Sequence, residues 1–239
     1  MSPLVAMAAA APSRAPDLAS RPLMLLLVVA ALSLLPFVLL LMTSFVKIAV
    51  VLSILRSALG SAQIPPSQVI TGLALILTLY VMAPTGERMY RAVAPQLALG
   101  AGVDLLSDQG MQALASAADQ AKEPLREFLL RHGSARERRV FHTLALRMRT
   151  EAERAHVVEH DFLVLVPAFL ASELRRAFEI GFLLFIPFLV IDLVVSSLLL
   201  TLGMNMLSPS TVSLPFKLLL FVLADGWQIL LRGLVEGYV

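Results

Sequence analysis

The chain has 239 residues, of which 58% are hydrophobic and only 15% are charged, and its mean hydropathy is +0.83. Soluble domains carry about 25% charged residues, so the composition indicates a membrane protein. A net charge of +2 with no Lys/Arg run argues against a nucleic-acid partner. The absence of cysteine excludes disulfides and Cys-ligated metals.

The N-terminal segment, residues 1–22, is a low-complexity stretch rich in Ala, Pro and Ser. The apolar run that follows, Leu23–Met42, holds no charge and is long enough to cross a bilayer. Two interpretations stay open: a signal peptide cleaved near Ala30–Ala31, or an uncleaved first transmembrane helix. We favour the helix because the apolar run continues through Met42.

A first hydrophobic helical region covers residues 23–83. After the uncharged run, Phe45–Leu59 is apolar but carries two basic residues, and Gly60 is typical of a helix C-cap. A further apolar piece, Val69–Met82, is predicted to end at Pro84, because proline interrupts helices. These pieces are short or charged, so we expect helical hairpins shielded by protein neighbours rather than by lipid alone.

Residues 84–161 contain eleven acidic and eleven basic residues, evenly mixed, which predicts a soluble helical region. Pro124 follows Glu123 and is expected at the first position of a helix. Gly133–Ser134 is expected to form a turn. We place this region on the periplasmic side, although its charges do not orient it, since long loops translocate largely regardless of charge.

A second hydrophobic helical region covers residues 162–239. It contains Phe162–Leu170, then Gly181–Leu202, and finally Leu214–Leu231, with a loop at residues 203–210. The whole pattern predicts an all-α membrane protein with about four hydrophobic spans and one inserted soluble region.

Six short motifs occur in order between about Leu23 and the C-terminus: Thr43-Ser44-Phe45-Val46-Lys47, Leu55-Arg56-Ser57-Ala58-Leu59-Gly60, Gln63-Ile64-Pro65-Pro66, Phe185-Ile186-Pro187-Phe188-Leu189-Val190-Ile191-Asp192-Leu193, Leu214-Pro215-Phe216-Lys217-Leu218-Leu219-Leu220-Phe221 and Asp225-Gly226-Trp227. Together they resemble the signature of the FliP/SctR family of type III secretion export-apparatus proteins. Ala49-Val50-Val51 and Tyr80-Val81-Met82-Ala83-Pro84 are similar to the injectisome branch (SctR, also YscR or HrcR) rather than to the flagellar branch.

The resemblance implies a homopentamer that joins smaller membrane subunits of the SctS and SctT type into an export gate. Further implied partners are the large export-gate protein, the switch protein of the apparatus, and unfolded protein substrates. The implied location is the bacterial inner membrane, with the assembled complex extending to periplasmic level. A gate of this kind supplies a conduit and a seal, so we expect no enzyme activity, cofactor or metal.

Asp192 and Lys217 are each a lone charge within an apolar block. A charge at mid-bilayer depth costs on the order of 3 kcal/mol, and pairing would offset much of that. In the family a matching Asp and Lys occupy these two motifs, so we predict an ion pair within or between subunits. The alternative is that each side chain reaches separately to an interface.

Met204-Asn205-Met206 lies in the loop between the last two apolar blocks. Methionine is flexible and fills irregular gaps, and the resemblance implies that a ring of such loops closes the pore. Asn205 departs from the Met-rich form of the family, which affects the tightness of the seal rather than its location. An ordinary turn is the alternative.

The remaining charges in or beside the apolar blocks are candidates for assembly contacts: Lys47, Arg56, Glu173, Arg175, Arg176 and Glu179. Those in the cluster after Leu170 lie at helical spacing. They would form either a network within one helix or salt bridges between subunits, and the sequence favours neither.

Two rival functions, an intramembrane hydrolase and a small-molecule transporter, have weaker sequence support. His156-Val157-Val158-Glu159-His160 matches the H-x-x-E-H pattern of a class of zinc peptidases, but no third ligand is identifiable. Asp192 and Asp225 could form an intramembrane aspartyl pair, although Lys217 offers Asp192 a simpler partner. A small-molecule secondary transporter would use intramembrane charges as ion sites, but the two halves of the chain show no matching pattern.

Overall fold

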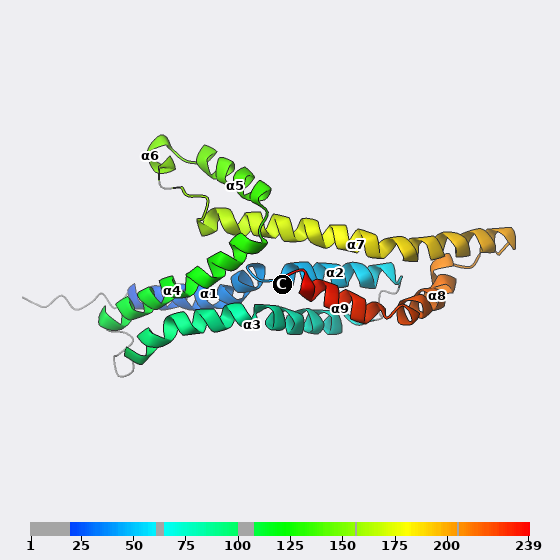
Figure 1. Ribbon diagram of the computed structural model, residues 1–239, viewed down its shortest axis with the longest axis horizontal. Coiled ribbons are helices and arrows are strands. Elements are labelled where there is room, and N and C mark those ends of the chain that lie inside the picture. Colours follow the sequence, from blue (N-terminus) through cyan, green and yellow to red (C-terminus); the bar gives the residue numbers. More distant parts are fainter. Residues whose placement is uncertain (1–19, 61–64, 100–107, 156, 205) are drawn as a thin grey trace, which may run out of the picture. The chain divides into compact units, whose positions relative to one another are not determined.

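The computed structural model describes residues 20–60, 65–99, 108–155, 157–204 and 206–239. Within these ranges the secondary structure is helical and contains no strand, which confirms the predicted all-α class (Figure 1). The helices are α1 (Ser20–Leu41), α2 (Phe45–Ala58), α3 (Ser67–Leu99), α4 (Asp108–His132), α5 (Ala135–Arg147), α6 (Glu151–Arg154), α7 (Phe162–Thr201), α8 (Pro209–Leu223) and α9 (Gly226–Glu236).

The chain divides into two units, residues 1–39 and 40–239. The first unit contains most of α1, a helix of 22 residues with Pro36 inside it. Its bounds nearly coincide with the apolar run Leu23–Met42, so the sequence located this helix well. Half of its side chains lie outside the described part of the structure.

The main core of the second unit is built around α2, which packs against both α3 and α7 (Figure 1). Its residues Ile48, Val51, Leu52 and Leu55 are completely buried. Their spacing of three and four residues places them on one stripe of the helix, and α8 and α9 cover the same core with Phe221 and other apolar side chains. The short helix α2 therefore buries one face, including Lys47, against other helices of the chain.

The α2–α7 contact is close at Gly181. A Cβ atom built on Gly181 would lie 2.4 Å from Ile54 Cδ1 and 3.0 Å from Ile54 Cγ2. Both distances are shorter than an ordinary van der Waals contact between carbons, so the two helices approach this closely only because residue 181 has no side chain.

We therefore expect Gly181→Ala to destabilise the protein by about 1–3 kcal/mol, the usual effect of overpacking a core. Detergent-based unfolding of the purified protein, followed by circular dichroism, measures the change. Adding Ile54→Val to Gly181→Ala removes Ile54 Cδ1, the nearest atom, and should restore part of the lost stability. Gly233→Ala in α9 is the control, because a Cβ there meets nothing within 4 Å; equal losses in both variants would contradict the explanation.

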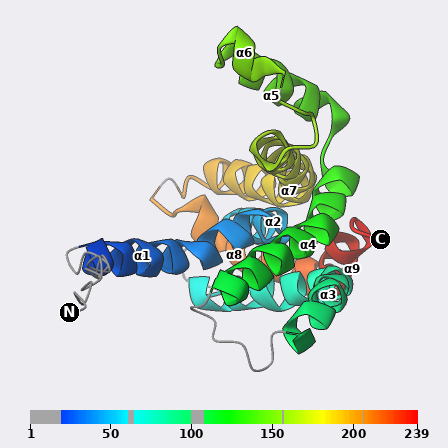
Figure 2. The ribbon, with the colours of Figure 1, turned by 90° about the vertical axis from the view of Figure 1, so that its left-hand side faces the viewer.

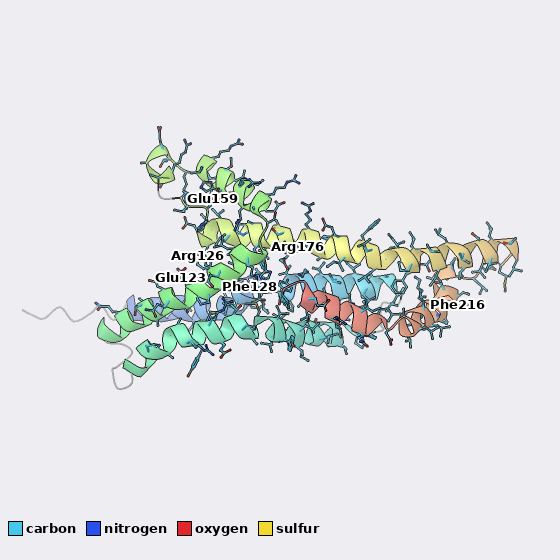
Figure 3. The ribbon with its side chains drawn as sticks, in the orientation of Figure 1. Glu123, Arg126, Phe128, Glu159, Arg176 and Phe216 are labelled. Atoms are coloured by element: carbon cyan, nitrogen blue, oxygen red, sulfur yellow. The ribbon has the colours of Figure 1, made fainter. Side chains whose placement is uncertain are left out.

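A second apolar cluster joins α4 to the first half of α7 and to the C-terminal residues. Phe128 and Leu129 of α4 pack with Phe169 of α7 and with Tyr238 (Figure 3 labels Phe128). The rings of Phe128 and Tyr238 are stacked with centroids 6.0 Å apart. This cluster places the end of the chain beside α4 and α7.

Three predictions about proline and helix boundaries were wrong. Helix α3 continues through Pro84 and Pro95, and α4 runs through Pro124 instead of beginning there. The blocks on either side of the charged cluster in the last region form one 40-residue helix, α7, which includes Pro167 and Pro187. Packing and an apolar environment keep these helices intact, because helix interiors in such surroundings tolerate a missing N–H better than isolated helices do.

The described residues support two or three of the about four spans expected from the sequence. The first expected span corresponds to α1, half of whose side chains lie outside the described residues. In the described ranges two helices are long and apolar enough to cross a membrane, Ser67–Pro95 and Phe162–Thr201, or three if the bent pair α8–α9 counts as one. Helix α2 has 14 residues, fewer than the roughly 20 that a bilayer requires. Between α8 and α9 the axis turns by 62°, at Asp225, which has a left-handed φ of 48°.

Helices α5 and α6 form an arm that diverges from α7 (Figure 2). The predicted turn at Gly133–Ser134 is confirmed, since α4 ends at His132 and Ser134 is the N-cap of α5. The Ser134 hydroxyl accepts a hydrogen bond from the backbone N–H of Arg136 at 3.2 Å, and the Ser134 N–H donates to Ser172 Oγ of α7 at 2.9 Å. The base of the arm is therefore fixed to α7.

Candidate functional site

The loop between α7 and α8 leaves α7 through a defined turn. Gly203 has a φ of +73°, its N–H donates to Leu200 O at 3.1 Å, and the N–H of Met204 donates to Leu199 O at 2.9 Å. These two bonds are the Schellman pattern, which needs a left-handed residue at the position of Gly203. The end of α7 therefore directs the next residues away from the helix axis.

The methionines that follow are open to the surroundings. Met206 is fully exposed and Met204 is 46% exposed. Asn205, the third member of the predicted gate triplet, lies outside the described residues. Large apolar side chains rarely remain exposed without a partner surface or lipid, so this loop presents flexible apolar groups that a single chain leaves unburied.

An apolar groove of about 470 Å³ lies behind the loop, between the end of α7 and α8. It is lined only by aliphatic side chains and by Phe216, which Figure 3 labels on α8. A groove of this size means that α7 and α8 are not tightly packed against each other near the loop.

Beside the groove, Asp192 of α7 and Lys217 of α8 lie against each other. Lys217 Nζ donates to Asp192 Oδ2 at 2.7 Å. The Lys217 side chain is 3% exposed and that of Asp192 is 32% exposed. This ion pair forms within one chain, so the Lys217 ammonium group is buried together with a counter-charge.

Two further groups complete this polar cluster, and the sequence interpretation did not include them. Lys217 Nζ also donates to the backbone carbonyl of Ala58, at the C-terminal end of α2, at 3.0 Å. The buried Ser213 hydroxyl donates to Asp192 Oδ1 at 2.6 Å. The spacing of Ser213 and Lys217, four residues apart on one helix, was the available signal, whereas the role of the Ala58 carbonyl depends on tertiary packing.

A second buried charge cluster surrounds Glu173 of α7, which is completely buried. Glu173 Oε2 lies 3.6 Å from Lys47 Nζ of α2 and accepts a hydrogen bond from the Tyr238 hydroxyl. Its other oxygen, Oε1, accepts from Arg176 Nη1 at 3.2 Å. Lys47 Nζ also lies 3.4 Å from the centre of the Tyr238 ring, an arrangement that favours a cation.

Tyr238 had no place in the sequence interpretation, although it completes this cluster. Its burial, followed by the negative charge of Glu173, raises the pKa of its hydroxyl well above the usual range. Tyr238 therefore remains a neutral hydrogen-bond donor to Glu173 at any ordinary pH. A tyrosine near the end of a helical block offers an apolar ring with a polar tip, which was the only signal in the sequence.

His132 lies beside this cluster, where its ring is tilted against Phe128 and edge-on to Tyr238, with ring centroids at 4.6 and 5.1 Å. Burial, and then the positive charges of Arg131, Lys47 and Arg176, lower the pKa of His132 to about 4. The imidazole is therefore neutral in the folded protein near pH 7, and protonation of this residue opposes folding.

Stability should consequently fall as the pH is lowered from about 6.5 to about 4. In that range the unfolded chain binds a proton at residue 132 while the folded chain does not, which lowers the free energy of unfolding by up to about 3 kcal/mol. His132→Phe keeps an aromatic ring and removes the titrating group. Unfolding curves at pH 7 and pH 5 should differ less for this variant than for the unchanged protein, and an identical pH dependence would contradict the assignment.

The other candidate assembly charges are placed differently. Arg175 Nε donates to Glu179 Oε1 at 2.9 Å, an exposed pair four residues apart within α7. Arg56 lies half-buried on α2. Within one chain the charge cluster forms local pairs, Arg175 with Glu179 and Arg176 with Glu173, and Glu173 also contacts Lys47 of α2. Salt bridges between subunits stay a prediction.

The H-x-x-E-H segment lies at the turn before α7. Glu159 Oε1 is 4.0 Å from Nδ1 of His142 on α5, while His160 is exposed and His156 lies outside the described residues. No group of three or more His, Asp or Glu side chains that could hold a metal ion occurs in the described part of the chain.

Long apolar helices, ion pairs between them and an exposed apolar loop at one hairpin define an integral membrane protein whose buried lysines are paired with carboxylates of the same chain. A model of the FliP family matches residues 28–234. The hypersensitivity response secretion protein HrcR of Ralstonia nicotianae is 44% identical over 214 residues, which cover 90% of this chain and 96% of that protein.

Two further relatives extend the comparison. Yop proteins translocation protein R of Yersinia pestis is 49% identical, over 90% of this chain and 95% of its own length. Flagellar biosynthetic protein FliP of Caulobacter vibrioides is 47% identical, over 87% of this chain and 73% of its own length. The chain therefore belongs to the FliP family, which includes SctR, and is a component of the type III secretion export apparatus.

Proposed function

We propose that the chain forms, as a homopentamer with smaller membrane subunits of the SctS and SctT type, the gate through which unfolded proteins leave the cytoplasm. The observation that carries this proposal is the α7–α8 loop, where Met206 is fully exposed beyond a fixed Schellman turn. Five such loops around one axis would form a deformable apolar ring. Met204, Asn205 and Met206 would close the conduit at rest and yield to a passing chain.

The proposed setting is the bacterial inner membrane, with residues 84–161 on the periplasmic side and the large export-gate protein and switch protein as further partners. The spans Ser67–Pro95 and Phe162–Thr201 support membrane insertion. The protein would act as a conduit and not as an enzyme, because the half-buried Asp192 and the buried Glu173 are held by lysine, serine and tyrosine partners rather than facing a substrate cavity.

Within the family we favour the injectisome branch. The secretion relatives HrcR and Yop protein R share 44% and 49% identity over at least 95% of their own lengths, and the motifs around Phe45 and Tyr80 are similar to this branch. The alternative is a gate of the flagellar branch, since FliP of Caulobacter vibrioides reaches 47% identity. Complementation of an injectisome and of a flagellar deletion strain would separate the two.

The gate is tested by deleting Met204–Met206 and measuring ion conductance of the assembled complex in planar bilayers. The deletion should raise the resting conductance, because the apolar ring would be missing. Native mass spectrometry of the same complex should show five copies of this chain with additional small subunits. An unchanged conductance, or a chain that remains a monomer in a complete apparatus, would contradict the proposal.

A further inference from the structure

The α7–α8 hairpin is held by one polar cluster and, farther from the loop, by apolar contacts such as Phe188 against Phe221. The groove of about 470 Å³ separates α7 from α8 near the loop. The cluster of Asp192, Lys217, Ser213 and the Ala58 carbonyl lies about 14 Å along α7 from its last residue, at nine residues and 1.5 Å each. The angle between α7 and α8 near the loop therefore depends on this cluster together with those apolar contacts.

Asp192 is the member of the cluster that can turn away. Its side chain is 32% exposed, against 3% for Lys217, so the carboxylate can rotate toward the surroundings at moderate cost. The two oxygens are held by different residues of α8: Oδ2 accepts from Lys217 at 2.7 Å and Oδ1 accepts from Ser213 at 2.6 Å. Two donors on opposite oxygens fix the plane of a carboxylate, whereas one donor does not.

Ser213 is completely buried and lies on the same face of α8 as Lys217, one helical turn earlier. Its hydroxyl lies 3.3 Å from the carbonyl oxygen of Ser210, a longer contact than the 2.6 Å to Asp192. A donor to a charged acceptor makes the stronger bond, so the proton of the Ser213 hydroxyl belongs to the bond with Asp192.

We propose that Ser213 is a positioning residue of the gate. By holding Asp192 Oδ1 it keeps Oδ2 on Lys217, and Lys217 in turn bridges α7 and α8 to the C-terminal carbonyl of Ala58 on α2. Without the Ser213 hydroxyl, the Asp192 carboxylate turns away from Lys217 part of the time. The α7–α8 hairpin then loosens around the apolar groove, and as a result the loop at residues 203–208 closes the conduit less completely. This inference rests on the proposed gate function.

The test measures resting conductance per assembled complex in planar bilayers for three variants. Ser213→Ala should raise the resting conductance about tenfold, the factor that one hydrogen bond to a charged group contributes to an equilibrium. Ser213→Cys, with a weaker donor of similar size, should give an intermediate value. Ser197→Ala is the matched control, because the Ser197 hydroxyl is exposed and donates at 2.9 Å to Leu193 O within its own helix.

The outcomes separate this inference from the gate itself. A residue with only a structural role would lower the yield of the complex without changing the conductance of each complex that forms. Normal conductance with Ser213→Ala, while deletion of Met204–Met206 leaks, overturns the role of Ser213 and leaves the gate intact. No leak after the deletion overturns the gate, and this inference with it. If Ser213→Ala does not assemble, normal conductance of Ser213→Cys overturns the proposal.

Discussion

Replacing Asp192 by alanine is expected to destabilise the protein by about 3–5 kcal/mol. The change leaves the ammonium group of Lys217, whose side chain is 3% exposed, with only the Ala58 carbonyl as a partner. An uncompensated buried charge costs far more than the lost contact itself. The measurement is the unfolding of the purified protein by increasing SDS, followed by helical circular dichroism.

The double variant Asp192→Leu with Lys217→Met is expected to be clearly more stable than Asp192→Ala alone. Two well-packed apolar side chains can replace an ion pair with little loss, because neither charge then has to be desolvated. Asp225→Asn is the control, since Asp225 is exposed and asparagine tolerates its left-handed backbone. If the single and double variants are equally unstable, the pair does not carry the stability assigned to it.

The geometry also limits a charge exchange. Lys217 donates to the Ala58 carbonyl as well as to Asp192. In the exchanged variant, Asp192→Lys with Lys217→Asp, a carboxylate would face that carbonyl oxygen, and two acceptors repel each other. Export measured in cells should therefore recover only in part relative to either single change. Full recovery would show that the Ala58 contact is unimportant.

The sequence identified the helical class and the charges that need partners, because lone charges in apolar blocks are costly wherever they lie. It did not identify the uncharged groups that form hydrogen bonds with these charges. Ser213 and Tyr238 are uncharged, and the Ala58 carbonyl belongs to the backbone. Composition alone therefore marks none of the three as a partner of a buried charge. Their contribution depends on how α2, α7 and α8 pack, which periodicity within one helix does not encode.

The helix boundaries failed for a related reason. The rule that proline ends a helix describes an isolated helix in water, where the lost hydrogen bond is not compensated. Pro84 and Pro124 lie in helices that pack against others, and there a continued helix satisfies the remaining backbone groups better than a break would. Turns marked by glycine, at Gly60 and Gly203, were placed correctly because a positive φ is a local requirement.

Replacing Glu173 by glutamine is expected to lower the free energy of unfolding by about 3–5 kcal/mol, although the side chain keeps its size. Glu173 is completely buried. Its carboxylate forms an ion pair with Lys47 and accepts hydrogen bonds from Arg176 and from the Tyr238 hydroxyl. A neutral amide leaves Lys47, itself 2% exposed, without a counter-charge. The same unfolding assay measures the loss.

Glu179→Gln provides the matched control on the same helix. Glu179 bonds Arg175 across one exposed turn of α7, and exposed pairs of this type contribute about 0.3–0.5 kcal/mol. The two substitutions are chemically identical and lie six residues apart, so a difference between them measures the effect of burial and of the additional partners of Glu173. Similar small losses at both positions would mean that Glu173 is accessible to water or to a neighbouring subunit in the working protein, and that its contacts within one chain do not hold α2 to α7.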